Sequence, residues 1–116
     1  MKEKFTKGPW DLLPAEESKE YLRVRGATLG GRYKIANVLD LQSHHNGSEW
    51  CKREREESIA NAKLIACAPD MYEEIKRDIE CLSRWIDNHG DAFPMTATWK
   101  DMRASKIELL KRVRDE

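Results

Sequence analysis

The first third of the chain alternates hydrophobic and polar residues with a period of two, which is the spacing of a half-buried strand. In the segment YLRVRGA, Leu22 and Val24 fall on one face. Tyr21, Arg23 and Arg25 fall on the other face. This pattern predicts a strand with one buried face and an exposed row of arginines on the opposite face.

The same alternation predicts a second strand in RYKIANVLDL. One of its sides carries Tyr33, Ile35 and Leu39, and the other carries Lys34, Ala36 and Val38. The intervening GATLGGR holds enough glycine for a hairpin turn that needs positive φ. A Gly8-Pro9 turn signal followed by Trp10 marks a short additional strand. The pattern predicts a two- or three-stranded antiparallel sheet within residues 8–41.

Beyond the polar loop QSHHNGSEW the apolar spacing changes to steps of three and four, which indicates helices. We predict helices near residues 49–68, 69–88 and 98–114. Pro69 ends or kinks the first of them because it lacks an amide hydrogen, and it suits the first position of the next. Small residues of the first helix favour a close approach to the sheet, namely Ala60, Ala62, Ala66 and Ala68.

Each of the two later helices carries an apolar stripe. The stripe of the middle helix consists of Tyr72, Ile75, Ile79, Leu82 and Ile86. The narrower stripe of the last helix consists of Met102, Leu109, Leu110 and Val113. Asn88-His89-Gly90 is expected to close the middle helix, and Thr98–Asp101 resembles a capping box. These two helices can pair as an antiparallel hairpin.

The order of elements predicts an α+β fold in a single domain over residues 1–116. Its sheet would occupy residues 8–41 and its helical part residues 49–114. A sheet of this size leaves open edges and a thinly covered face. We therefore expect self-association into a homo-oligomer.

Charge changes the picture by excluding partners that need a strong global field. The 116 residues include 21 Lys plus Arg and 21 Asp plus Glu, so the formal net charge is zero. A neutral chain does not attract nucleic acid or an anionic membrane, and any anion site must be local. The three cysteines lie in helix-like segments with no recognisable signal peptide before them, so we expect reduced thiols in a cytoplasm.

The first candidate binding site is the arginine row, Arg23 and Arg25, together with Gly30, Gly31 and Arg32 across the hairpin. Glycine amides can form a nest for phosphate, and arginine forks bind phosphate oxygens in pairs. A symmetric oligomer would gather these charges around an axis, where they could hold a cyclic oligonucleotide. The alternative is a solvated strand face whose charges protect the sheet edge from pairing.

A second candidate site combines Tyr72, Arg77 and Asn88 with Arg103 of the last helix. The four side chains would offer an aromatic face for a base, an amide for its edge and guanidinium groups for pyrophosphate. The alternative for Tyr72 is packing in the core, because it begins the apolar stripe.

Metal and catalytic chemistry have little support in the sequence. The spacing of His44, His45, Cys51 and His89 matches no tetrahedral zinc pattern. No glycine elbow presents a serine, and the glycine strings of phosphate-binding loops are absent. DNA binding through KREREES and Trp50 is weakened by charges that nearly cancel. We expect no metal, no cofactor and no enzymatic activity.

The start GPW, the short sheet and NAKLIACAP together resemble a widespread group of small phage and prophage proteins. The matching residues are Gly8, Pro9, Trp10, Asn61, Ala62, Leu64, Ile65, Ala66, Ala68 and Pro69. Met71 stands where the group usually has leucine, which is a conservative change. The resemblance implies a phage origin and the order of elements, without an activity.

A looser resemblance, in size and architecture, is to the first family of Thoeris anti-defence proteins, phage proteins that sequester immune nucleotide signals. It implies no particular binding residue. Our first hypothesis is therefore a phage protein in the host cytoplasm that binds, without cleaving, a cyclic oligonucleotide or cyclic ADP-ribose signal. The second is a protein–protein inhibitor or adaptor that acts on a host defence enzyme. A structural phage protein without a specific ligand is a third interpretation.

Overall fold

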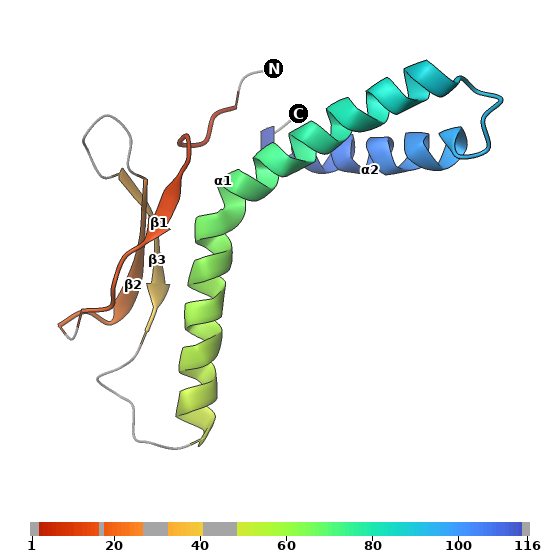
Figure 1. Cartoon of the computed structure of the whole chain (residues 1–116). Coiled ribbons are helices and arrows are strands. Elements are labelled where there is room, and N and C mark those ends of the chain that lie inside the picture. The colour runs from red at the N-terminus through yellow and green to blue at the C-terminus, as the bar shows by residue number, and fades with distance from the viewer. Residues whose placement is uncertain (1–2, 17, 27–32, 41–48, 115–116) are drawn as a thin grey trace. The chain divides into compact units, whose positions relative to one another are not determined.

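The computed structural model describes residues 3–16, 18–26, 33–40 and 49–114 (Figure 1). In these ranges three strands are followed by two helices, which confirms the predicted α+β class. The elements are β1 (Trp10–Leu12), β2 (Tyr21–Gly26), β3 (Tyr33–Leu39), α1 (Glu49–His89) and α2 (Thr96–Arg114). They form two compact units, residues 6–70 and residues 1–5 with 71–116, and α1 contributes to both.

The sheet is antiparallel, as predicted, and its strand order is β1-β2-β3. Leu22 and Val24 are buried, and they pair with Val38 and Ala36 of β3. The side of β3 that carries Ala36 and Val38 therefore shares the buried face of β2. Leu39, on its other side, is exposed.

The predicted exposure of the arginine row is wrong for Arg25, which is 8% exposed. The register between β2 and β3 shifts between Val24 and Arg25, so the ladder of hydrogen bonds is irregular there. The Arg25 guanidinium donates to the carbonyl of Ala36 at 3.1 Å, next to this irregularity. The alternation of residues could not predict this burial, because a bulge changes the pairing without changing the sequence period.

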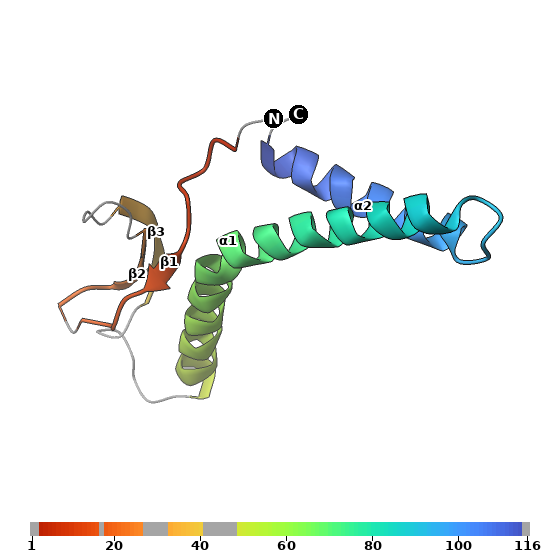
Figure 2. The same cartoon turned by 45° about the horizontal axis from the view of Figure 1, so that its top comes forward.

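The first part of α1, residues 49–70, lies alongside the sheet (Figures 1 and 2). Ala62 is fully buried, whereas Ala60 and Ala68 are exposed, so the predicted set of small contact residues is only partly right. Near the start of this part, Arg55 Nε lies 3.2 Å from a carboxylate oxygen of buried Asp40, which follows β3.

Pro69 does not end a helix, so the prediction of separate helices at 49–68 and 69–88 is wrong. It lies inside α1, which is continuous from Glu49 to His89. A proline in a helix interior costs about 3 kcal/mol, yet tertiary packing can offset that cost. Pro69 is buried, and a Cβ atom added to Gly8 would lie 2.7 Å from its Cβ. Gly8 therefore packs closely against Pro69.

In the other unit, residues 71–89 of α1 and the whole of α2 form the predicted helical hairpin (Figure 2). Tyr72, Leu82 and Ile86 of the predicted stripe are buried, and Ile75 and Ile79 are half-buried, which confirms it. On α2, Leu110 is buried, but Met102, Leu109 and Val113 are exposed, so that stripe is largely wrong. Polar partners explain the difference, since Arg103 donates to Ser83 Oγ and Lys106 pairs with Asp78.

The connection between the helices begins after His89, as predicted, but it ends at Thr96, before the predicted helix start near residue 98. Gly90, with a φ of 74°, follows the last residue of α1. α2 begins at Thr96, so the predicted capping box at Thr98–Asp101 lies inside the helix. The Thr96 hydroxyl is buried and donates to the Gly90 carbonyl at 2.6 Å. Within the described residues, no helix combines the length and the hydropathy needed to cross a membrane.

Candidate functional site

The first candidate site is built on β2, and its two described arginines are both engaged within the protein. Arg25 donates to the Val24 carbonyl at 2.9 Å and to the Asn37 side-chain oxygen at 2.9 Å, in addition to Ala36. Arg23 lies 2.6 Å from a carboxylate oxygen of Glu16. Arg25 is therefore a structural residue, whereas partly exposed Arg23 could exchange its carboxylate for another anion.

The other members of that candidate, Gly30, Gly31 and Arg32, lie outside the described residues. The proposed glycine nest and its arginine across the hairpin therefore stay predictions. His44 and His45 of the weighed metal set lie outside the described residues as well.

The second candidate site is not brought together. Tyr72 and Asn88 lie on the same helix 16 positions apart, or about 24 Å along its axis at about 1.5 Å per residue. Arg77 is exposed and pairs with Glu74 on its own helix. Arg103 contacts Ser83, near the middle of the hairpin. Tyr72 is buried, which confirms its interpretation as a core residue.

Tyr72 is the centre of a polar network that the sequence did not predict. Its hydroxyl donates to Glu3 Oε1 at 3.1 Å and accepts from Arg114 Nε at 2.6 Å. Lys76 Nζ also donates to Glu3 Oε1, at 3.0 Å, and Arg114 Nη2 lies 3.7 Å from the same oxygen. One carboxylate from the start of the chain therefore meets a phenol and two cations of the helical hairpin.

This network shifts the proton affinity of its members. The hydrogen bond from Lys76, followed by a backbone hydrogen bond and the Tyr72 hydroxyl, lowers the pKa of Glu3 to about 2. The hydrogen bond to Glu3 raises the pKa of Lys76. Burial is the main cause that raises the pKa of Tyr72. Glu3 is therefore an anion and Lys76 a cation at neutral pH.

A cavity of about 240 Å³ adjoins this network, since Lys76 and Arg114 line it. Its apolar lining comes from Ile79, Ile107 and Leu110, and its charged lining also includes Glu80 and Lys111. All of these residues belong to the unit formed by the helical hairpin. The arrangement combines an apolar wall with cations, which suits an anion that carries an apolar body.

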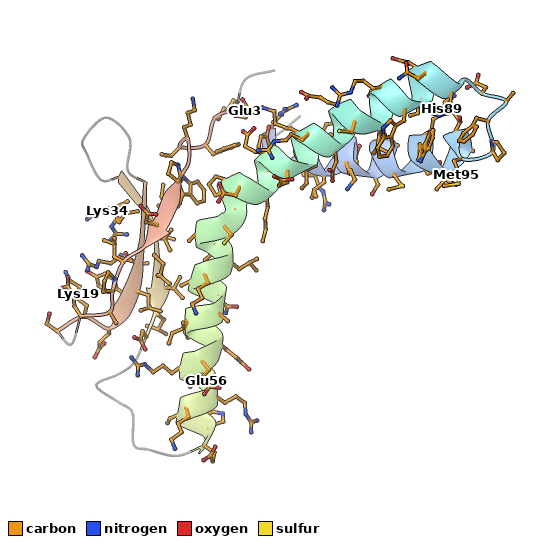
Figure 3. All side chains as sticks on the ribbon, viewed as in Figure 1. Glu3, Lys19, Lys34, Glu56, His89 and Met95 are labelled. Carbon is orange, nitrogen blue, oxygen red and sulfur yellow. The ribbon has the colours of Figure 1, made fainter. Side chains whose placement is uncertain are left out.

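A second feature that the sequence did not predict lies at the closed end of the hairpin, around His89 and Met95 (Figure 3). Ring centroids lie 5.6 Å apart for Trp85 and Trp99, 5.4 Å for Phe93 and Trp99, and 4.5 Å for His89 and Phe93. Trp85 is nevertheless 47% exposed, Phe93 38% and Met95 46%. We call these five residues, Trp85, His89, Phe93, Met95 and Trp99, the hairpin-end aromatic surface.

A signal for this surface was present in the sequence. Trp85 falls outside the buried stripe that contains Ile86, and it stands four residues before His89, so both lie on one face of α1. Phe93 and Met95 are apolar residues within a connection of DAFPMTA composition. Bulky apolar residues that group outside the predicted core are the sequence signal of such a surface.

Metal-ligating side chains do not gather in the described ranges, where no group of three or more His, Cys, Asp or Glu could hold an ion. Cys51, Cys67 and Cys81 form no disulfide with one another. His89, from the weighed set, instead contacts the rings of Phe93 and Trp99.

Comparison with protein families gives a match over residues 1–109 to a family described as Salmonella phage P22 protein Y8K6. The chain belongs to this family. Comparisons with curated proteins and with solved structures gave no match.

Membership in the phage P22 Y8K6 family shows that this is a phage protein, which agrees with the phage origin that the resemblance implied. The match includes the sheet, α1 and most of α2, and therefore also Tyr72, Lys76 and the hairpin-end aromatic surface. It carries no activity and no ligand. The resemblance to Thoeris anti-defence proteins stays a prediction.

Proposed function

We propose that this member of the phage P22 Y8K6 family is a binding protein that inhibits or redirects a host protein, with a host defence enzyme as the target class. The observation that carries the proposal is the hairpin-end aromatic surface. Tryptophan and other aromatic residues supply much of the binding energy at protein interfaces. A cluster of exposed rings is costly in water unless a partner covers it.

Two further observations support a binding role over the other classes. The candidate arginines that the structure describes are engaged within the protein, with Arg25 buried and Arg77 paired to Glu74. The aromatic rings also contact one another, so the surface is ordered before a partner arrives. An ordered surface loses less conformational entropy on binding than a flexible one.

The test compares Trp85→Ala and Phe93→Ala with Trp50→Ala, since Trp50 is also on α1, is 67% exposed and belongs to the other compact unit. Tagged variants would be expressed during phage infection of a host with active defence systems. Recovery of phage plaques and the co-purified host protein would be measured together. We expect loss of both with Trp85→Ala or Phe93→Ala, by about 30-fold in affinity if either is an interface hot spot.

The control sets the condition for rejecting this function. Trp50→Ala should keep both the partner and the plaque recovery, and all three variants should keep the helical circular dichroism of the parent. If the host protein still co-purifies with Trp85→Ala and Phe93→Ala, the hairpin-end aromatic surface is not the binding surface. The same conclusion follows if Trp50→Ala loses the host protein to the same extent.

Sequestration of an immune nucleotide signal is the second candidate function, and the three cations Lys76, Lys111 and Arg114 support it because each can pair with a phosphate group. Titration calorimetry against cyclic di- and trinucleotides and cyclic ADP-ribose isomers, with light scattering to count subunits, tests it. Submicromolar binding with recovery of the intact ligand supports a sponge without enzymatic activity. Arg23→Ala and Arg32→Ala then distinguish the sheet site from the cavity. No heat with any compound rules out sequestration of those signals.

A further inference from the structure

The cavity of the helical hairpin has two chemically distinct sides. Ile79, Ile107 and buried Leu110 give it an apolar wall. Lys76, Lys111 and Arg114 give it three cations, against one lining carboxylate, that of Glu80. An apolar wall favours burial of a hydrocarbon or aromatic body, and the cations favour binding of a negatively charged head group.

The chain itself shows that two of these cations, Lys76 and Arg114, accept a carboxylate. Glu3 is separated from Lys76 by 73 positions, yet its Oε1 lies 3.0 Å from Lys76 Nζ and 3.7 Å from Arg114 Nη2. The ring of Phe5, two residues later, meets the Tyr72 ring edge-on with centroids 4.9 Å apart. An acidic group and an apolar ring on one short segment are therefore already bound on this part of the hairpin.

The Glu3 contact is of a kind that another anion can replace. The side chains of Glu3, Lys76 and Arg114 are each partly exposed. Ion pairs at such positions are weak and exchange with solvent and salt. A ligand that brings its own anion and also fills the apolar wall would therefore gain burial that Glu3 alone does not supply.

We propose that this cavity binds a small organic anion, with a phosphate or carboxylate head and an apolar body, and that Glu3 competes with it for Lys76 and Arg114. The volume of about 240 Å³ lies below the roughly 300–1,000 Å³ of pockets for drug-sized ligands, so the apolar body that fits is one or two rings in size. The site is separate from the hairpin-end aromatic surface and does not rest on a protein-binding function.

The first experiment uses three probes that share one ring system: 1-naphthyl phosphate, 1-naphthoate and neutral 1-naphthol. Amide chemical shifts of the full chain would be followed by NMR during titration. We expect saturable shifts at residues 76–80 and 107–114 with either anion, and weaker binding of 1-naphthol. A response to one anion only identifies its head group. Equal binding of 1-naphthol, or shifts confined to residues 85–102, would overturn the proposal.

The second experiment changes the charge of the site in both directions. Lys111→Gln should weaken binding of 1-naphthyl phosphate by about two- to fivefold, and Glu3→Gln should strengthen it by a similar factor, as expected for partly exposed charges. Arg112→Gln and Glu108→Gln make the same charge changes on exposed positions of α2 that do not line the cavity. Both controls should leave the affinity unchanged.

The opposite signs keep the test decisive even if one variant disturbs the fold. A loss of fold would weaken binding in Glu3→Gln, whereas competition requires stronger binding. Glu3→Gln binding no more tightly than Glu108→Gln, or Lys111→Gln no more weakly than Arg112→Gln, would contradict the proposed site.

Discussion

At the scale of single residues, the two arginines of β2 differ in what holds them. Arg25 donates to two backbone carbonyls and to Asn37, and it is almost entirely buried. The Arg23 side chain is partly exposed and pairs with Glu16. They stand two residues apart on one strand, and Arg25 lies beside the irregular register with β3 and opposite Asp11 of β1.

This difference predicts unequal effects of removing the two side chains. Arg25→Ala should lower the free energy of unfolding by about 1–3 kcal/mol, because buried acceptors lose their donor. Arg23→Ala should cost about 0–1 kcal/mol, which is typical of an ion pair near the surface. Urea denaturation of both variants and the parent measures the two values. Equal costs would show that the hydrogen bonds of Arg25 add little to stability.

At the scale of elements, the ends and the continuity of the helices follow different rules. The end of α1 is local, because Gly90 adopts the positive φ that glycine tolerates. The continuity of α1 through Pro69 is not local, since Pro69 packs against Gly8. The start of α2 depends on a contact of medium range in the sequence, because the Thr96 hydroxyl donates to the Gly90 carbonyl at the other end of the connection.

We therefore expect the hydroxyl of Thr96, and not that of Thr98, to contribute to the stability of the folded protein. Thr96→Val keeps the shape of the buried side chain but removes its hydrogen bond, which should cost about 0.5–1.5 kcal/mol. Thr98→Val is the matched control, because Thr98 is exposed inside the same helix. Thermal unfolding of both variants tests this. An equal effect at Thr98 would mean that helix propensity, and not the hydrogen bond, sets the cost.

At the scale of the whole molecule, contacts between distant parts of the sequence hold the start of the chain on the helical hairpin. Glu3 meets Lys76, Tyr72 and Arg114 through one carboxylate oxygen. The chain has no net charge, so local networks of this kind, and not a global field, create its electrostatic features. Their contribution to stability depends on pH through Glu3.

The sign of that dependence follows from the lowered pKa of Glu3. Its value of about 2 in the folded protein lies below the ordinary value of 4.5, so the folded state favours the carboxylate. The resulting stabilisation is complete above about pH 4.5 and is lost as the pH falls towards 2. The melting temperature of the parent should exceed that of Glu3→Gln at pH 7, and the difference should shrink over this range.

A control separates this effect from general charge repulsion in acid. Glu108→Gln removes the same charge from an exposed position of α2, away from the network. Its melting temperature should stay close to that of the parent at pH 7. If the melting temperature of Glu3→Gln equals that of the parent at pH 7, the network does not stabilise the fold.

The sequence by itself determined the α+β class, the buried pair Leu22 and Val24, the stripe that begins at Tyr72, and the end of α1 before Gly90. Each of these depends on residues that are close in sequence or on a repeated spacing of apolar residues. Both kinds of signal can be read from the sequence alone.

Only the tertiary structure decided that Pro69 continues a helix, that Arg25 is buried, and that Glu3 meets Lys76. For the hairpin-end aromatic surface, the spacing of Trp85 and His89 was a signal in the sequence, but the tertiary structure decided that the connection between the helices leaves Trp85 and Phe93 exposed. These outcomes come from contacts between residues that are distant in sequence, or from a shift in strand register. Neither leaves a periodic trace among neighbouring residues, so the local pattern could not predict them.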